Sequence, residues 1–361
     1  MADKKDNPTL KTVRAGAKPS KPGAPLRNRQ GKRKELTLGE YVDGILGGDR
    51  VVLSQAITLI ESSLPEHMEL ALEIIERCLP HTGNAIRVGI TGVPGVGKST
   101  FIETLGIYLT ETEKRRVAVL AIDPRSERTK GSILGDKTRM TSLATDPNAF
   151  IRPSAAAASL GGVARNTRET ILLCEAAGFN TIIVETVGVG QSETTVHSMV
   201  DFFLLLMLAG AGDELQGIKR GIMEMADAIA ITKADGANAT KAKLAQKEYQ
   251  GAIRLFPPTG TGWTPRVLTC SAVENTGIRE VWETVLEHNG SLSEKGFIAQ
   301  MRREQGKKWM HEAIRLSLDE RFYDDPNIKE ALGEIEREVA QGHTSPFTGA
   351  KRLLDIYGNK P

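Results

Sequence analysis

Apolar residues recur at helical spacing soon after the start of the chain. Two sets, each spaced four, three and four residues apart, precede residue 80: Leu53, Ile57, Ile60 and Leu64, then Met68, Leu72, Ile75 and Leu79. This spacing places each set on one face of a helix. Pro65 separates the two sets and marks a turn. The stretch from Leu36 to Leu79 is therefore predicted to be a helical hairpin leading into the main domain.

From Ile86 to about Gly290, short β-branched runs alternate with helical stretches. The expected strands are Arg87–Thr91, Val117–Ile122, Asn180–Glu185, Phe202–Met207, Ala228–Thr232 and Arg266–Thr269. The expected helices between and after them are Lys98–Leu109, Thr167–Ala177, Leu215–Met225, Asn238–Leu255 and Ile278–His288. Such alternation is typical of an α/β fold, in which helices flank both faces of a mostly parallel sheet.

After Gly290 the strand signal stops and helical spacing returns. Four apolar residues again follow the four-three-four pattern, namely Ile328, Leu332, Ile335 and Val339. The pair Ser345-Pro346 is typical of the start of a last helix. These helices either cover the domain's own sheet or form an arm that packs on a second subunit. Spacing alone does not separate the two.

The charge is distributed unevenly along the chain. Residues 1–34 hold eleven Lys/Arg and two Asp, although the whole chain of 361 residues carries only +2. This head also has four prolines and few large apolar residues, which predicts a disordered, solvated leader. A basic tail can bind nucleic acid, but no aromatic residues interleave these charges, so a nucleic-acid partner is not expected. No apolar core follows the bases, which excludes a secretory signal.

Cysteine usage and apolar run length indicate the compartment. Cys78, Cys174 and Cys270 lie far apart and form no CxxC pair, so we expect buried thiols in a reducing environment. The longest apolar run, Phe202–Ala209, has the length of a strand, whereas a membrane span needs about 20 residues. The sequence therefore predicts a cytoplasmic protein without a membrane partner.

A phosphate-binding loop follows the first expected strand. The segment GVPGVGKST matches the pattern GxxxxGK[ST] and precedes an expected helix. Backbone N–H groups of such a loop surround the β-phosphate, the lysine bridges the β- and γ-phosphates, and the Ser hydroxyl binds Mg²⁺. The predicted nucleotide contacts are Gly92, Val93, Pro94, Gly95, Val96, Gly97, Lys98, Ser99 and Thr100.

Two later segments identify the base as guanine. ITKADG fits the pattern [NT]KxD, so the carboxylate of Asp235 can accept from N1–H and N2–H₂ of guanine, while the Lys233 stem lies along the purine. Adenine lacks this pair of donors and would leave the carboxylate unmet. TCSAVENTG resembles the loop whose backbone N–H meets guanine O6, which adds three expected contacts: Ser271, Ala272 and Val273.

Acidic residues at strand ends are the candidates for binding Mg²⁺, because this ion takes hard oxygen ligands. They are Asp123, Asp136 and Glu185, each of which can instead be a helix cap or a solvated acid. In ETVGVGQSE, the Gly188 N–H is expected to contact the γ-phosphate and to release the loop after hydrolysis. The role of Gln191 stays open.

A third glycine-rich, charged segment, AGAGDELQGIKRG, follows the most apolar expected strand. Asp213, Glu214, Lys219 and Arg220 can form switchable ion pairs there, or simply be the solvated start of a helix. Both interpretations fit the residues equally well.

Taken together, GVPGVGKST, VLAIDPRSERTKGSILGDKTRM, AFIRPS, SLGGVARNTRETILLCEAAGFNTIIVETVGVGQSE, AGAGDELQGIKRGIMEMADAIAITKADG and TCSAVENTGI resemble the MeaB/ArgK family. These are GTPases that act as chaperones of methylmalonyl-CoA mutase. The resemblance runs from about Leu36 to the C-terminus. It implies a P-loop NTPase fold of the SIMIBI type and a homodimeric GTPase that binds GTP and Mg²⁺.

The resemblance also implies that the protein gates adenosylcobalamin delivery to the mutase, keeps damaged cofactor out and helps release inactive cofactor. No DxHxxG signature is present, so the corrinoid is expected on the partner. The implied catalytic residues are Lys98, Asp123 and Gly188, the metal ligands are Ser99, Asp123, Asp136 and Glu185, and a third switch coupled to the mutase contains Asp213, Glu214 and Lys219.

The predicted organisation has four parts: a disordered leader over 1–34, a helical segment over 35–84, a GTPase domain over 85–290 and, as the resemblance implies, a helical dimerisation arm over 291–361. Two departures from the family pattern, Arg125 and the Ala155–Ala158 run, adjoin expected switches and leave their coupling open. No arginine finger or water-activating residue is evident, so slow hydrolysis is expected without a partner. The alternatives are a nickel-insertion GTPase, a transport-associated ATPase or kinase acting on basic amino acids, and a non-catalytic nucleotide-binding scaffold.

Overall fold

The structure is a computed structural model that describes residues 36–122, 140–153, 160–186, 192–210, 220–257 and 259–358. Residue contacts divide the chain into two units, Met1–Leu36 and Thr37–Pro361. All helices and strands of the described residues belong to the second unit, and the predicted leader over 1–34 lies outside the described residues. The predicted boundaries after residues 34, 84 and 290 stay predictions.

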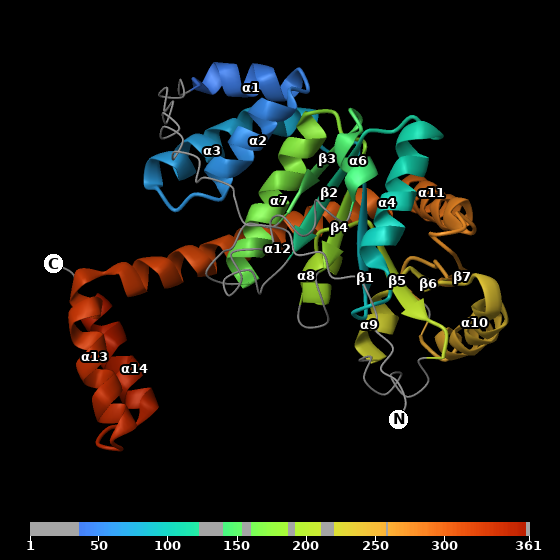
Figure 1. The fold of residues 1–361 in the computed structure, drawn as a ribbon. Helices are drawn as coiled ribbons and strands as arrows, with labels where there is room; N and C mark the ends of the chain where they lie inside the picture. The colour runs from blue at the N-terminus through green and yellow to red at the C-terminus, as the bar shows by residue number, and fades with distance from the viewer. Residues whose placement is uncertain are drawn as a thin grey trace, which may run out of the picture. The chain divides into compact units, whose positions relative to one another are not determined.

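Seven parallel strands form one sheet in the order β3-β2-β4-β1-β5-β6-β7 (Figure 1). Their bounds are Ile86–Gly92 (β1), Val117–Ile122 (β2), Ala149–Arg152 (β3), Thr181–Thr186 (β4), Phe202–Leu208 (β5), Ala228–Thr232 (β6) and Arg266–Thr269 (β7). β1 lies at the centre, where Val88 is opposite Ile183 of β4 and Phe202 of β5. The predicted α/β class is confirmed, and β3 is a strand that the sequence pattern did not reveal.

One face of the sheet is covered by α4 (Lys98–Glu111), α6 (Thr141–Thr145) and α11 (Ile278–Glu294). The main hydrophobic core lies between these helices and the strands, and its largest fully buried side chains include Phe101 and Trp282. The strands carry near-continuous apolar runs because both of their faces are buried, as is usual for parallel sheets.

The opposite face is covered by α7 (Leu160–Ala176), α8 (Ser192–His197) and α9 (Arg220–Met225). α8 lies so close to β1 that a Cβ on Gly89 would come within 2.8 Å of the Val196 side chain. The turn Gly236–Asn238 leads into α10 (Ala239–Ile253), which packs against β6 and β7.

The N-terminal segment has three helices where the sequence pattern predicts a hairpin of two. They are α1 (Leu38–Leu46), α2 (Arg50–Ile60) and α3 (Pro65–Cys78), followed by a 3₁₀ turn at Leu79–His81. Gly48, at φ +76°, provides the additional turn, and the Asp49 carboxylate then caps α2 by accepting from Val51 N–H and Val52 N–H. All three helices pack against α7.

The C-terminal helices are α12 (Phe297–Asp324), α13 (Pro326–Ala340) and α14 (Pro346–Gly358). α12 packs against α7 and α11, whereas α13 and α14 pack against each other around a separate apolar cluster of Ile328, Ile335 and Leu353. The predicted last helix begins at Pro346, as expected. Because their buried residues do not belong to the core of the sheet, α13 and α14 do not cover that sheet.

Candidate functional site

The predicted phosphate loop joins the end of β1 to the start of α4. Gly97 precedes α4 at φ +94°, a conformation that favours glycine. A Cβ on Gly92 would lie 2.5 Å from the Leu206 carbonyl oxygen, so this position has no room for a side chain. Val96 is fully buried and fixes the loop to the core. This strand–loop–helix context is the one that the sequence motif requires.

Lys98 is half-buried at the first position of α4. Its Nζ donates to the carbonyl oxygens of Gly92 at 2.7 Å and Val93 at 3.4 Å. Burial lowers the pKa of Lys98, and the charges of Glu185 and Glu193 oppose that shift. The lysine is therefore held in the loop by backbone oxygens, and the two carboxylates favour its charged ammonium form, which is the form that can bind a phosphate.

Glu193 is a site residue that the sequence motifs did not identify. It is the second residue of α8, its exposed fraction is 1%, and its charge acts on Lys98. Buried carboxylates are rare unless they are paired or functional. The only sequence signal was its place at the end of ETVGVGQSE, because a glutamate in a short helix gives no indication of burial.

Two hydroxyl contacts connect β1 and α4 to β4 at the carboxyl edge of the sheet. Ser99 Oγ donates to Glu185 Oε1 at 3.4 Å, and Thr186 Oγ1 donates to Thr91 Oγ1 at 2.8 Å. Glu185 is buried at the end of β4. The structure thus brings together two of the four predicted metal ligands.

The described oxygens suit Mg²⁺, which commonly takes one or two protein ligands and completes its shell with phosphate and water. Within the described ranges, no group of three His, Cys, Asp or Glu side chains lies close enough to hold a metal unaided. Ser99 and Glu185 are a matching partial set of hard donors.

The predicted guanine-binding residues meet where β6 and β7 end. Ser271 Oγ donates to Asp235 Oδ2 at 2.5 Å, and Ala234 N–H donates to the Cys270 carbonyl at 3.0 Å. Ala272 belongs to the same corner, where its carbonyl accepts from Thr104 Oγ1 of α4 at 3.2 Å. Val273 beside it is 85% exposed and makes no contribution to the core. The Asp235 carboxylate is therefore oriented before any base is present.

Lys233 connects the base-binding segment to the phosphate loop. Its backbone is left-handed at φ +54°, and its Nζ donates to the Gly95 carbonyl at 2.9 Å. Thr232 Oγ1 makes a second connection by donating to the Val96 carbonyl at 2.7 Å. A purine bound beside Asp235 therefore lies next to the loop that is expected to hold its phosphates.

Several predicted site residues lie outside the described residues. They are Asp123, Asp136, Gly188, Gln191, Asp213, Glu214 and Lys219, together with Arg125 and the Ala155–Ala158 run. Thr100 is described and exposed at the start of α4. The individual roles of all these residues stay predictions.

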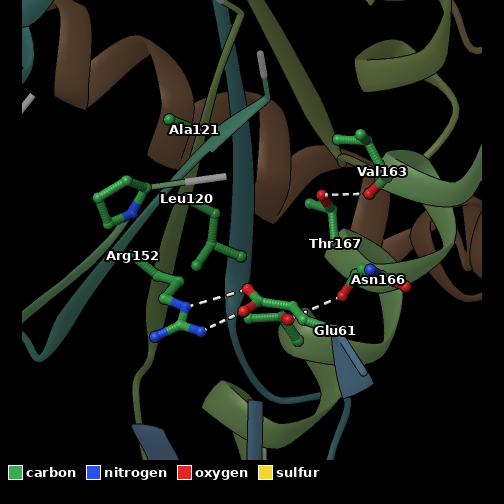
Figure 2. A pocket seen from close by; sticks show the side chains of 9 residues that line it. Glu61, Leu120, Ala121, Arg152, Val163, Asn166 and Thr167 are labelled. Atoms are coloured by element: carbon green, nitrogen blue, oxygen red, sulfur yellow. Dashed lines mark hydrogen bonds and ion pairs between the residues drawn. The ribbon is translucent and has the colours of Figure 1, made fainter. Parts of the chain in front are cut away.

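A separate small cavity lies beside the carboxyl ends of β2 and β3 (Figure 2). Its volume of about 20 Å³ suits a single water. Arg152, the last residue of β3, forms an ion pair with Glu61 at the end of α2, with its Nε 3.1 Å from Glu61 Oε1. Thr167 and Asn166 of α7 complete the polar lining. This ion pair fastens the N-terminal helices to the edge of the sheet.

No helix among the described residues has the length and apolar character needed to cross a membrane. All three cysteines are buried, free thiols, as the sequence predicts.

Known proteins are similar to this chain over most of its length. The family model described as methylmalonyl-CoA mutase-associated GTPase MeaB matches residues 53–327. A probable GTPase of Mycobacterium bovis is 52% identical over 321 residues, which cover 88% of this chain and 95% of that protein. The mitochondrial methylmalonic aciduria type A homolog of Mus musculus is 44% identical, covering 88% of this chain and 79% of that protein.

A solved structure gives the same result for the fold. The crystal structure of an LAO/AO transport system kinase superposes with a TM-score of 0.70 at 37% identity, covering 91% of this chain and 99% of that one. The phosphate loop, the base-binding corner and these extended similarities agree, and the chain belongs to the MeaB family of methylmalonyl-CoA mutase-associated P-loop GTPases.

Proposed function

We propose that this GTPase is a chaperone of an adenosylcobalamin-dependent methylmalonyl-CoA mutase, gating cofactor delivery and protection and the release of inactive cofactor. The observation that carries the proposal is the match over residues 53–327 to a family described by its association with that mutase. The methylmalonic aciduria type A relative in Mus musculus supports it. The corrinoid belongs to the partner in this proposal, since the chain has no DxHxxG signature.

In the proposed mechanism, Lys98 exchanges its bonds to the Gly92 and Val93 carbonyls for the β- and γ-phosphate oxygens of GTP. The Ser99 hydroxyl and the Glu185 carboxylate would hold Mg²⁺, with Asp123 and Asp136 as the further ligands that the sequence predicts. Bound there, Mg²⁺ would supply charge neutralisation for the β- and γ-phosphates.

Guanine binding is assigned to the corner after β6 and β7. The Asp235 carboxylate, held by the Ser271 hydroxyl at 2.5 Å, accepts from N1–H and N2–H₂ of the base. The Lys233 stem covers the purine, and its ammonium steadies the loop through the Gly95 carbonyl. Gly188 contacts the γ-phosphate, and Asp213, Glu214 and Lys219 form the switch that reports to the mutase.

The C-terminal helices are proposed to form the homodimer interface. α12 exposes an apolar stripe at four-residue spacing, with Met310 54%, Ile314 48% and Leu318 55% exposed. On α14, Phe347 is 87% exposed and Leu354 60% exposed. An apolar helix face that the rest of the chain does not cover is typical of a subunit interface, so we assign it to contact with a second copy of the chain. A cytoplasmic location fits the three free thiols.

The test is binding and turnover with a purified methylmalonyl-CoA mutase. Size-exclusion chromatography should show a complex whose affinity differs between GDP and a non-hydrolysable GTP analogue, and the mutase should raise the rate of phosphate release. Lys98→Ala is the control, since its complex should no longer respond to the nucleotide. Absence of a complex, or equal turnover with and without the mutase, overturns the proposal.

A transport-associated ATPase or kinase is the second candidate, favoured by the similarity to the solved LAO/AO transport system kinase. The Asp235 corner argues for guanine, because adenine has no donor pair for this carboxylate. Comparing GTP with ATP affinity by calorimetry separates the two candidates: ATP binding equal to GTP binding favours the second. A nickel-insertion role has no support among the described residues, which include no His- or Cys-rich cluster.

A further inference from the structure

The turn over residues 198–201 joins α8 to β5, and side chains of α12 form hydrogen bonds with it. At its end, Asp201 accepts from Arg302 of α12 through Nε at 2.8 Å and Nη2 at 2.5 Å. Arg302 also donates to the carbonyl oxygens of Gly83 and Ala85, both at 2.5 Å. α12 is thus fixed to the amino edge of the sheet by one guanidinium.

Two further side chains of α12 bind carbonyl oxygens of the same turn. Gln305 Nε2 donates to the Val200 carbonyl at 3.0 Å, and Trp309 Nε1 donates to the Ser198 carbonyl at 3.2 Å. Gln305 is buried, and its bond replaces one that water cannot supply there. The three contacts follow one face of α12 and reach Asp201, Val200 and Ser198 of the turn.

α7 supports the same place from a different direction. The Arg168 guanidinium lies over the Trp309 ring at 5.4 Å and forms an ion pair with Glu312 of α12. It also approaches Ser198 Oγ at 3.4 Å. The end of α8 is therefore enclosed between α7 and α12, which Figure 1 shows side by side.

The other end of α8 lies at the phosphate loop. Glu193 is in its first turn, is 1% exposed and acts on Lys98 through its charge. α8 has only six residues, so it spans about 9 Å at 1.5 Å per residue. Because Val196 of α8 packs against Gly89 of β1, α8 has no room to move toward β1. A shift of the 198–201 turn is therefore carried through α8 to the carboxylate beside Lys98.

We propose that Trp309 and Gln305 are positioning residues for GTP hydrolysis: they hold the 198–201 turn, and thereby place α8 and Glu193 against Lys98. The inference concerns the turnover of this chain alone, so it stands whether or not a mutase is the client. It also supplies a route for regulation, because α12 continues into α13 and α14. A protein bound to those helices can change turnover by shifting α12.

The test compares Trp309→Phe with Trp263→Phe. Both tryptophans donate from Nε1 to a backbone carbonyl, Trp263 to Asp227 at 2.9 Å, and both lie under an arginine at 5.4 Å. Each substitution removes one such bond and keeps an aromatic ring. Trp263 lies beside the amino end of β6, where its ring packs against His288 of α11, so it controls for lost stability.

We expect Trp309→Phe to lower kcat about threefold to tenfold, and Trp309→Phe with Gln305→Ala to lower it further, because small displacements of reacting groups cost large factors in rate. The KM for GTP and the affinity for GDP should change less than about twofold, since binding is retained. Trp263→Phe should lower Tm by about as much as Trp309→Phe does, but it should leave kcat unchanged.

A double-mutant cycle with Glu193→Gln tests the route itself. If the tryptophan acts through Glu193, Trp309→Phe should have little further effect on kcat in the Glu193→Gln background. Full additivity of the two substitutions overturns the route. An unchanged or raised kcat in Trp309→Phe, or an equal loss in Trp263→Phe, overturns the proposal as a whole.

Discussion

The amino edge of the sheet and the nucleotide site at its carboxyl edge use the same kinds of charged residue in opposite ways. At the amino edge, Arg87 forms a bidentate ion pair with Glu175, and Arg302 does the same with Asp201. At the carboxyl edge, Lys98 and Lys233 form no ion pair within the described part of the chain and donate to backbone carbonyls of the phosphate loop.

This difference separates charged residues that stabilise the fold from charged residues that can bind a ligand. A charge whose partner is another buried side chain is already satisfied, and removing that partner leaves a buried charge uncompensated. A charge that rests on carbonyl oxygens can exchange them for a phosphate with little cost to the fold. Stability should therefore depend most on the buried ion pairs of the amino edge, and nucleotide binding on the two lysines of the phosphate loop and base-binding corner.

The largest expected effect is at the amino edge. Asp201→Ala leaves Arg302 and the Arg87 N–H without their carboxylate, which should lower the free energy of unfolding by about 3–5 kcal/mol. Urea denaturation measures it. Glu287→Ala is the control, since its ion pair with Arg266 is about half exposed and should contribute less than about 1 kcal/mol. Similar losses in the two variants would contradict the proposed division of roles.

Lys98→Ala should show the reverse pattern at the carboxyl edge. Removal of a charge that stabilises the transferring phosphoryl group should lower kcat/KM for GTP by about 10²–10³-fold. The free energy of unfolding should change by less than about 1 kcal/mol, because the lysine is half-buried and bonded only to carbonyls. Phosphate release and urea denaturation on one preparation give both values. A large loss of stability would show that this edge also fastens the fold.

Asp235→Asn should weaken GTP binding by about 100-fold, because an amide cannot accept from both guanine donors as the carboxylate does. Xanthosine triphosphate, which carries a carbonyl in place of the 2-amino group, should bind the variant better than it binds the natural protein. Calorimetry with both nucleotides measures the exchange. Ser271→Ala, which frees the carboxylate from its 2.5 Å hydrogen bond, should weaken GTP in the same direction but less. If Asp235→Asn keeps the natural protein's preference for GTP over xanthosine triphosphate, the assignment of Asp235 to base binding is wrong.

The carboxyl edge was predictable from the sequence because its function depends on local segments. The phosphate loop and the TKxD and SA loops are each continuous, and their backbone geometry follows from residues such as Gly97. Their meeting at one edge follows from the parallel sheet alone. Ser99 and Glu185 lie in contact at that edge, and their role as metal ligands stays a prediction.

The amino edge and the α8 clamp were not predictable in this way. The bonds between Arg302 and Asp201 and between Trp309 and Ser198 join residues about a hundred positions apart. One sequence carries no signal for such pairs. β3 was missed because it has four residues, lies at the sheet edge and is followed by Pro153. α7 begins earlier than predicted because packing overrides the two glycines near its start.

The smallest expected effect tests whether the carboxyl edge of the sheet stays folded around the buried Cys270 thiol without a ligand. Burial raises the pKa of the Cys270 thiol to about 12, from a usual value of 9.0. Above pH 9 the unfolded thiol loses its proton while the folded one keeps it, so stability falls as pH rises. The contribution of this thiol between pH 9 and pH 10 is about 1 kcal/mol.

Urea denaturation of the natural protein and of Cys270→Ala at pH 8 and pH 10 measures this term, because other groups titrate equally in both. The stability difference between the two proteins should shift by about 1 kcal/mol in favour of the variant at pH 10. Cys174→Ala, in α7 beside Glu175, should shift in the same direction, since burial also raises that thiol's pKa.

A shift for Cys174 without one for Cys270 would mean that the thiolate forms at the carboxyl edge without global unfolding. The contrast between the edges would then extend to their local stability, with the nucleotide side opening while the ion-paired side stays closed.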